Sequence, residues 1–288
     1  MAECNLQPTY KRQRFLLAIL RQLQSGVTST DLQKLVFLYI MKEKLEFYEF
    51  IPYKFGSYSF QLAEDVEVLQ RNGYLSTESS RIKAIGEYSN EVLFPIATER
   101  GDNLIRKAYR EYPYYAINSE IISRIFNAEE AEQFISGRKR YDKTEQVLFT
   151  IGYEGKSIEA FINTLIQNDI RLLCDVRKNP LSRKFGFSKR KLEHITETIG
   201  IKYIHIPELG IDSDKRSSLI TMKDYQCLFS EYEKTLPNYK QQLKWLYSLL
   251  CDNVRISLMC YEKDPVMCHR HVIRDCLTNT HKIRNQDI

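Results

Sequence analysis

The sequence predicts an α/β protein, in which a three-layer α/β/α domain with a mostly parallel sheet follows a mainly helical domain. Residues 145–288 alternate short apolar runs with stretches of helical periodicity, which is typical of a parallel sheet covered on both faces. Residues 11–80 show helical periodicity and one short extended stretch. A charged, apolar-poor segment at 137–143 lies between the two patterns. At 288 residues, the chain is long enough for two domains that each bury a core.

In the first region, residues 1–80, three helices are expected before a strand. Phe15 to Leu23 has helical spacing, a second helix starts at Thr30 and Asp31, and a third runs from about Ser59 to Gly73. Phe47 to Tyr53 is expected to be extended, and Tyr74 begins a strand. Three helices followed by a strand is the order of a winged-helix module.

The second region, residues 81–144, is polar and mixed. Helical stretches are expected around Thr98 to Tyr109 and Ser119 to Phe134. We expect this region to form a helical connector or an extension of the first domain.

The third region, residues 145–288, carries four predicted strands, each buried because its residues are mainly apolar. The strands are expected at Val147 to Gly152, Arg171 to Val176, Tyr203 to Ile206 and Arg255 to Met259. The helices are expected at Ser157 to Asn168, Lys189 to Ile199, Tyr225 to Leu250 and His271 to Leu277.

Composition indicates a cytoplasmic protein without a membrane anchor. The hydrophobic fraction of 43% and the charged fraction of 27% are ordinary for a globular chain. No apolar run approaches the roughly 20 residues of a membrane span, and the N-terminus has no signal-peptide pattern. Seven cysteines without disulfide-scaffold spacing fit free thiols in a reducing compartment.

Polar side chains follow all four predicted strands. The carboxyl ends of parallel strands meet at one edge of a sheet, where α/β proteins bind ligands. We expect catalytic roles in this set: Asp175, Glu208, Cys268 and His269. We expect substrate contacts from this set: Tyr153, Arg177, Arg183, His205, Glu262 and Arg270. Cys268 is the better thiol candidate, because an adjacent imidazolium and a helix N-terminus would lower its pKa.

A basic run lies between Arg177 and Lys191, with seven cationic residues and no acidic one, in a chain whose net charge is +5. Such a run attracts a polyanion, so nucleic acid or a nucleotide is the expected partner. Phe185 and Phe187 within it suit stacking on bases. A solvated helix face for the cations and core packing for both phenylalanines stay open as alternatives.

No cofactor and no metal ligand is assigned from the sequence. A zinc site from Cys260, Cys268 and His269 stays open, although their spacing departs from the usual Cys-x2–4-Cys pairs. Neighbouring ligands on a helix also rarely point at one centre. There is no P-loop and no Gly-x-Gly-x-x-Gly motif, so ATP and dinucleotide sites have no support.

The third region resembles the family called domain of unknown function 488. These motifs carry the resemblance: Thr150-Ile151-Gly152-Tyr153, Asp175-Val176-Arg177, Tyr203-Ile204-His205-Ile206-Pro207-Glu208, Leu258-Met259-Cys260 and Cys268-His269-Arg270. Tyr153-Glu154 departs from the His-Ser that the family often shows, which puts a family role for the first strand end in doubt. The resemblance implies an α/β fold with a polar pocket at the strand ends, and it implies no particular reaction.

The first region resembles a winged helix-turn-helix domain through Thr30 to Leu35 and Pro52 to Ser59. It is also similar to an antitoxin-associated domain, although Ser57 replaces a proline of that pattern. By analogy, these resemblances imply DNA binding or a defence setting. The predicted third helix carries Glu64, Asp65 and Glu67, which suits phosphates poorly, so a protein partner stays open.

The sequence therefore predicts an enzyme that acts on nucleic acid or a nucleotide, with hydrolysis as the leading reaction class. Arginines at the strand ends would hold phosphate, and a carboxylate, Asp175 or Glu208, would act as general base. Two alternatives stay open. One is a thiol enzyme with Cys268 as nucleophile, and the other is a regulator that binds a nucleotide, DNA or protein without turnover.

Overall fold

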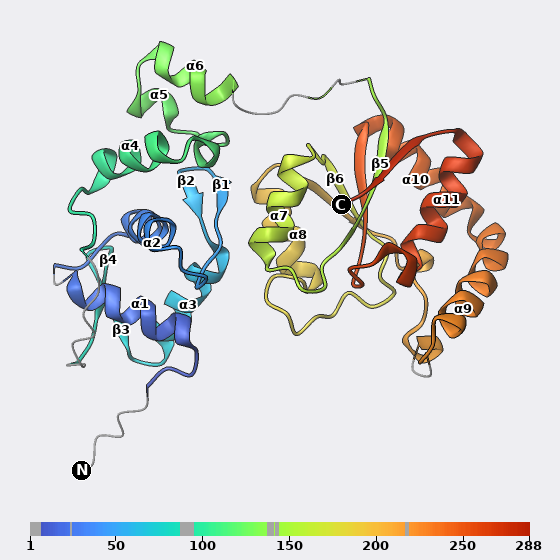
Figure 1. The fold of residues 1–288 in the computed structure, drawn as a ribbon, viewed down its shortest axis with the longest axis horizontal. Coiled ribbons are helices and arrows are strands. Elements are labelled where there is room, and N and C mark those ends of the chain that lie inside the picture. The colour runs from blue at the N-terminus through green and yellow to red at the C-terminus, as the bar shows by residue number, and fades with distance from the viewer. Residues whose placement is uncertain (1–6, 24, 87–94, 137–140, 142–143, 217–218) are drawn as a thin grey trace. The chain divides into compact units, whose positions relative to one another are not determined.

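The computed structural model describes residues 7–23, 25–86, 95–136, 141, 144–216 and 219–288 (Figure 1). The chain divides into two compact units, residues 1–138 and 139–288. No helix within the described ranges has both the length and the apolar character needed to cross a membrane.

The C-terminal unit is built on a five-stranded, all-parallel sheet. Its strands are β5 (Val147–Gly152), β6 (Leu172–Asp175), β7 (Lys202–His205), β8 (Arg255–Cys260) and β9 (Arg284–Asp287). They are ordered β7-β6-β8-β5-β9, so β8 lies in the middle, between β6 and β5. The two longest strands, β5 and β8, are buried along their whole length, which explains their mainly apolar sequences. The predicted α/β class is confirmed.

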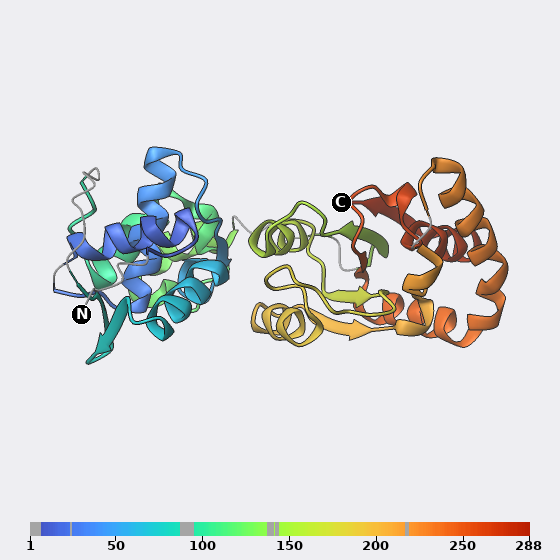
Figure 2. The ribbon, with the colours of Figure 1, turned by 90° about the horizontal axis from the view of Figure 1, so that it is seen from below.

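Helices cover both faces of this sheet, as Figures 1 and 2 show. On one face lie α7 (Ile158–Gln167) and α8 (Lys189–Thr198). On the other lie α9 (Met222–Thr235), α10 (Lys240–Asn253) and α11 (Arg270–His281), whose apolar side chains form one core cluster with strand residues such as Leu148 and Leu258. Ser157 caps α7 by accepting a hydrogen bond from the backbone N–H of Ala160 at 2.9 Å.

The strand β9 was not predicted. Each residue of its sequence, Arg-Asn-Gln-Asp, is exposed and none is apolar, so no hydrophobic pattern marks it. It pairs with β5 at the edge of the sheet, where Val147 lies opposite Arg284 and Thr150 opposite Asp287.

The N-terminal unit begins with α1 (Lys11–Gln22) and α2 (Ser29–Glu43). A hairpin of β1 (Ile51–Tyr53) and β2 (Gly56–Tyr58) follows, then α3 (Phe60–Arg71) and a second hairpin of β3 (Leu75–Glu78) and β4 (Arg81–Ala84). Val27, between α1 and α2, pairs with Ile82 of β4.

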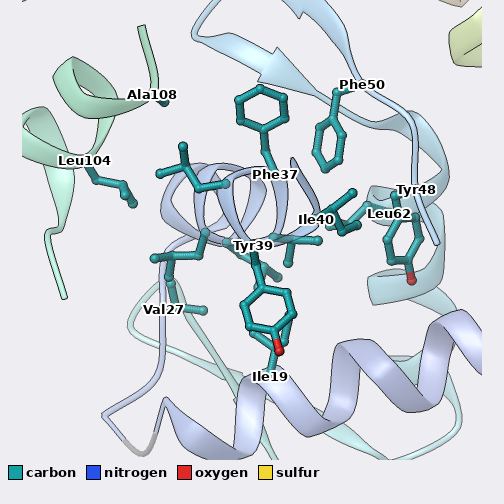
Figure 3. Packing of buried hydrophobic residues seen from close by; sticks show 14 of the residues in the cluster. Ile19, Val27, Phe37, Tyr39, Ile40, Tyr48, Phe50, Leu62, Leu104 and Ala108 are labelled. Atoms are coloured by element: carbon teal, nitrogen blue, oxygen red, sulfur yellow. The ribbon is translucent and has the colours of Figure 1, made fainter. Parts of the chain in front are cut away.

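The helix α2 is the centre of this unit, because every residue from Asp31 to Ile40 is buried. In Figure 3, Phe37 lies beside Phe50, and the apolar side chains of neighbouring elements surround α2. Polar side chains on α2 are also buried. Gln33 exchanges hydrogen bonds with the backbone of Ser59, and Lys34 donates to the carbonyl of Ser57 at 2.7 Å.

The region expected as a connector, 81–144, contains α4 (Gly101–Glu111), α5 (Ile122–Ile125) and α6 (Ala128–Ser136). Leu104, Tyr109 and Ile122 belong to the same apolar cluster as α1 and α2. Residues of these helices therefore pack into the core of the N-terminal unit.

Candidate functional site

The carboxyl edge of the parallel sheet carries a pocket of about 240 Å³. Parallel pairing brings its elements together, since Gly152 of β5 lies opposite Cys260 of β8, and Asp175 of β6 lies opposite Met259. The pocket is lined by these residues: Tyr153, Arg177, Lys178, Asn179, Leu181, Ile211, Cys260, Tyr261 and Glu262. The lining combines aromatic, cationic, thiol and carboxylate groups.

Two glycines allow the loops around this pocket to approach one another. A Cβ atom on Gly152 would lie 1.8 Å from the carbonyl oxygen of Glu262, and one on Gly210 would lie 2.2 Å from the backbone nitrogen of Lys178. The loop after β8 therefore crosses directly over the end of β5, and the turn after β7 packs on the chain leaving β6. No other residue type fits at either position without moving backbone.

Asp175 and Arg177 form a buried ion pair beneath the pocket. Arg177 donates from Nε to Oδ1 of Asp175 at 2.8 Å and from Nη2 to Oδ2 at 2.5 Å. Tyr203 donates its hydroxyl to Oδ2 of Asp175 at 2.6 Å, and the backbone N–H of Arg177 donates to Oδ1. Asp175 is fully buried and accepts four hydrogen bonds, which leaves its carboxylate poorly placed to take a proton from a substrate.

Arg177 has further donors engaged as well. Nη1 donates to the hydroxyl of Tyr153 at 3.1 Å and to the carbonyl of Phe187 at 2.9 Å. Burial alone would lower the pKa of Arg177, but the hydrogen bonds and charge of Asp175 outweigh burial and raise it. The arginine predicted to hold phosphate thus supports the pocket from below and is only 5% exposed.

Aromatic rings form one wall of the pocket. The ring of Tyr153 stacks on Phe187 with centroids 4.3 Å apart and planes inclined by 12°. Tyr261 meets Tyr153 edge to face at 5.2 Å and is 46% exposed. Phe187, which was a candidate for base stacking, is buried in the core, whereas Tyr261 presents its ring at the surface.

Neither His205 nor Glu208 belongs to the lining of the pocket. The Nε2 atom of His205 lies 2.8 Å from the carbonyl oxygen of Arg177, so this ring fixes the chain leaving β6. Glu208 is exposed on a short 3-10 turn, Pro207–Leu209, and does not line the pocket. Arg183 is likewise exposed and outside the lining.

Arg270 is buried at the start of α11 and holds the loop after β8. It donates to the carbonyl oxygens of Glu262 and Lys263 and to Oγ1 of Thr150. Its guanidinium is therefore occupied by backbone and by Thr150, contrary to the expected grip on a substrate anion. Its role in the structure is to fix the position of Glu262.

Three buried side chains, Cys260, Cys268 and His269, face one another behind the pocket. Each sulfur lies 3.8 Å from Nδ1 of His269, and the three potential ligand atoms are all within 4.8 Å of one another. Burial, the neighbouring Cys260 thiol and the charge of Glu262 raise the pKa of Cys268 well above its usual value, although Arg270 opposes this. The expected lowering of that pKa is wrong, because desolvation outweighs the nearby cation.

The cationic residues of the basic run between Arg177 and Lys191 differ in their exposure to solvent. Lys178, Arg183, Lys189 and Arg190 are exposed, whereas Arg177 is buried. Lys184 is half-buried and donates to the carbonyl of Tyr153 at 3.2 Å. Only part of the run is therefore available to a polyanion.

Sequence reasoning missed several residues that line the pocket, namely Lys178, Asn179, Leu181, Ile211 and Tyr261. Tyr261 directly follows β8, and Lys178 and Asn179 follow the end of β6 by a few residues. The rule that ligands bind beyond the carboxyl ends of parallel strands would have identified these three. Leu181 and Ile211 lie on loops and carry no such signal.

Comparison with known proteins agrees with the resemblance for the C-terminal half. Residues 157–277 match the family model described as Domain of unknown function DUF488. The matched segment includes β6, β7 and β8, together with Asp175, Glu208 and the Cys268-His269-Arg270 sequence. No curated protein and no solved structure matches the chain.

Proposed function

We propose that the C-terminal unit is an enzyme acting on nucleic acid or a nucleotide, with hydrolysis as its reaction class and the pocket at the carboxyl edge as its active site. The observation that carries the proposal is the lining itself, in which the exposed ring of Tyr261, the cation of Lys178 and the carboxylate of Glu262 meet around one cavity. An aromatic ring suits a base, a cation suits a phosphate and a carboxylate suits proton transfer.

The roles within the pocket follow from exposure and from hydrogen bonding. Lys178 of the lining and Arg183 of the same basic run are exposed and therefore accessible to phosphate. Glu262 is the carboxylate of the lining, and Arg270 holds its backbone in place. We therefore assign the general-base role to Glu262 in place of Asp175 and Glu208, and treat Asp175 and Arg177 as positioning residues.

We propose that the N-terminal unit is a winged-helix module that positions the substrate or a partner. Supporting this assignment, α1, α2 and α3 precede the β3–β4 hairpin, and Val27 adds a further extended segment beside β4. Asp65 of α3 is buried and bound by Arg12, Gln13 and Tyr48, so it does not repel phosphate directly. Glu64 and Glu67 remain on α3, which keeps a protein partner as the alternative occupant.

We place this activity in the cytoplasm. The six cysteines in the described part of the chain all have free thiols, which fits a reducing compartment.

The test is binding of labelled single- and double-stranded oligonucleotides across a salt series, followed by a product search. The double variant Lys178→Ala/Arg183→Ala should weaken binding and flatten its salt dependence, because two phosphate contacts are lost. The matched control, Lys234→Ala/Lys244→Ala, removes the same charge from α9 and α10, away from the pocket lining, and should bind as the native protein does. Equal binding by both double variants would contradict the proposal.

Turnover is tested with Glu262→Gln, which should retain binding and lose product formation in nucleotide, RNA and DNA digests analysed by mass spectrometry. Salt-sensitive binding by the native protein without any product would favour the regulator that binds without turnover.

A further inference from the structure

We propose that Cys260, Cys268 and His269 form a binding site for a transition-metal ion, with zinc as the ion that best fits the donors. Two thiols and one imidazole are the ligand types that zinc prefers. The three side chains come from the end of β8 and the start of α11, and all are buried. The inference concerns metal binding alone and does not depend on the proposed hydrolytic function.

The distances agree with a tetrahedral zinc centre. Zinc–sulfur and zinc–nitrogen bonds of the usual length place a sulfur and a nitrogen ligand about 3.6 Å apart. In the structure, Nδ1 of His269 is 3.8 Å from Sγ of Cys260 and 3.8 Å from Sγ of Cys268. Both sulfur–nitrogen separations therefore fit ligands of one tetrahedral ion, and all three donor atoms lie within 4.8 Å of one another.

The orientation of His269 favours a metal ligand. Its Nε2 atom lies 3.0 Å from the carbonyl oxygen of Val176, which can only accept a hydrogen bond. Nε2 therefore carries the proton, and the lone pair of Nδ1 faces the two sulfurs. A backbone carbonyl that fixes the far nitrogen is the usual outer-shell arrangement of a metal-bound histidine.

The neighbouring positions of Cys268 and His269 do not prevent convergence. Cys268 has an extended backbone, with φ −138° and ψ 136°, and His269 is the N-cap of α11 with φ −57° and ψ −18°. Adjacent ligands within a helix point apart, but Cys268 precedes α11 and the chain turns between Cys268 and His269 before the helix begins.

The cluster borders the pocket through Cys260. Cys260 and Glu262 both line the cavity, and Oε2 of Glu262 lies 3.3 Å from Sγ of Cys260. Three protein ligands and one exchangeable position are typical of a catalytic zinc site, whereas structural sites have four protein ligands. The arrangement therefore predicts a centre that is open to small molecules in the pocket.

The experiment uses the full chain, purified under reducing conditions without chelators. Elemental analysis should find one zinc ion per chain. After the zinc is removed with a chelator, added Co²⁺ should produce a thiolate-to-cobalt charge-transfer band in the near ultraviolet. Cys260→Ser and Cys268→Ser should lose this band, while Cys227→Ser and Cys276→Ser, which change thiols outside the cluster, should keep it.

A folded native protein, judged by circular dichroism, that contains no metal and gives no cobalt band would overturn the proposal. If the serine variants do not fold, the native protein still decides the question: mercurial titration of its thiols should release zinc to a chromogenic chelator in step with the loss of two thiols. The oligonucleotide-binding assay is read separately, so a metal site without oligonucleotide binding, or the reverse, identifies which proposal has failed.

Discussion

Arg177 grips Asp175 with two parallel hydrogen bonds, although the two residues are separated by a single position at the end of β6. The pair lies beneath the pocket, with Asp175 fully buried and Arg177 5% exposed. Each charged group stabilises the other, because an unpaired charge in a buried site has a high free-energy cost.

Replacing Asp175 by alanine should lower the free energy of unfolding of the C-terminal unit by about 3–5 kcal/mol, since it leaves the guanidinium of Arg177 buried without its counter-charge. Urea unfolding followed by the fluorescence of Trp245, the single tryptophan of the chain, measures this unit. Arg183→Ala, at an exposed position of the same basic run, should change the free energy by no more than about 0.5 kcal/mol. Equal stability of the two variants would show that the pair is not structural.

The sequence was sufficient to predict four of the five strands of the parallel sheet, but not the edge strand β9. The alternation of apolar runs and helical periodicity predicted β5 to β8, because a buried parallel strand has a mainly apolar sequence. The stretch Tyr225 to Leu250, expected to be mainly helical, is two helices, α9 and α10, separated by a 3-10 turn at Leu236–Tyr239 that contains a proline. The edge strand β9 is exposed and needs no apolar sequence. Its residues, Arg284 to Asp287, could therefore not be distinguished from a loop by their sequence.

Strand ends correctly indicated the edge of the sheet at which the pocket lies, but not the role of each residue there. Arg177 and Arg270 have the same chemistry as a phosphate-binding arginine, and only the three-dimensional structure shows that carboxylate and carbonyl oxygens already occupy them. For Cys268, proximity to His269 suggested a lowered pKa, whereas the degree of burial, which sequence does not report, raises it.

Gly152→Ala should disrupt the pocket, because the new Cβ atom would overlap the carbonyl oxygen of Glu262. Displacing that backbone should destabilise the C-terminal unit by about 1–3 kcal/mol, the usual cost of overpacking. It should also weaken any binding that depends on Glu262 or Tyr261.

Gly155→Ala is the matched control for this change. Gly155 lies on the same loop with φ +76°, and a Cβ atom added there would have no neighbour within 4 Å, so alanine adds backbone strain without a clash. That strain should cost about 1–2 kcal/mol. Ligand binding retained in Gly155→Ala and lost in Gly152→Ala would confirm that the close approach shapes the site. Equal ligand binding by the two variants would exclude a role for this close approach in shaping the site.

Cys268 should be among the least reactive thiols of the chain toward iodoacetamide at neutral pH. It is buried, so access is restricted, and in the metal-free protein its raised pKa also leaves little thiolate. Cys227 and Cys251 are exposed and should be alkylated first, which peptide mass spectrometry over a time course can measure. Alkylation of Cys268 as fast as free cysteine would instead support the nucleophilic thiol mechanism.

Lys34 should make the stability of the N-terminal unit depend on pH. Burial lowers the pKa of its ammonium group to about 7, although the charge of Asp31 opposes the shift. An unfolded chain has the ordinary value near 10.4, so between about pH 7 and pH 10 the unfolded state binds more protons at this position than the folded state. Stability therefore rises with pH across this window, and it is insensitive to Lys34 below it, where both states are protonated.

From pH 7 to pH 9 the gain should be roughly 2 kcal/mol, given the lowered pKa of about 7. Urea unfolding followed by circular dichroism measures it, with Trp245 fluorescence separating the transition of the C-terminal unit. Lys34→Met keeps a chain of similar length and removes the titrating group, so the difference between the two proteins isolates this residue from others that titrate in the same range. Parallel pH profiles for the two proteins would mean that the amine of Lys34 is hydrated in solution, and that its hydrogen bond to Ser57 does not hold it in a dry core.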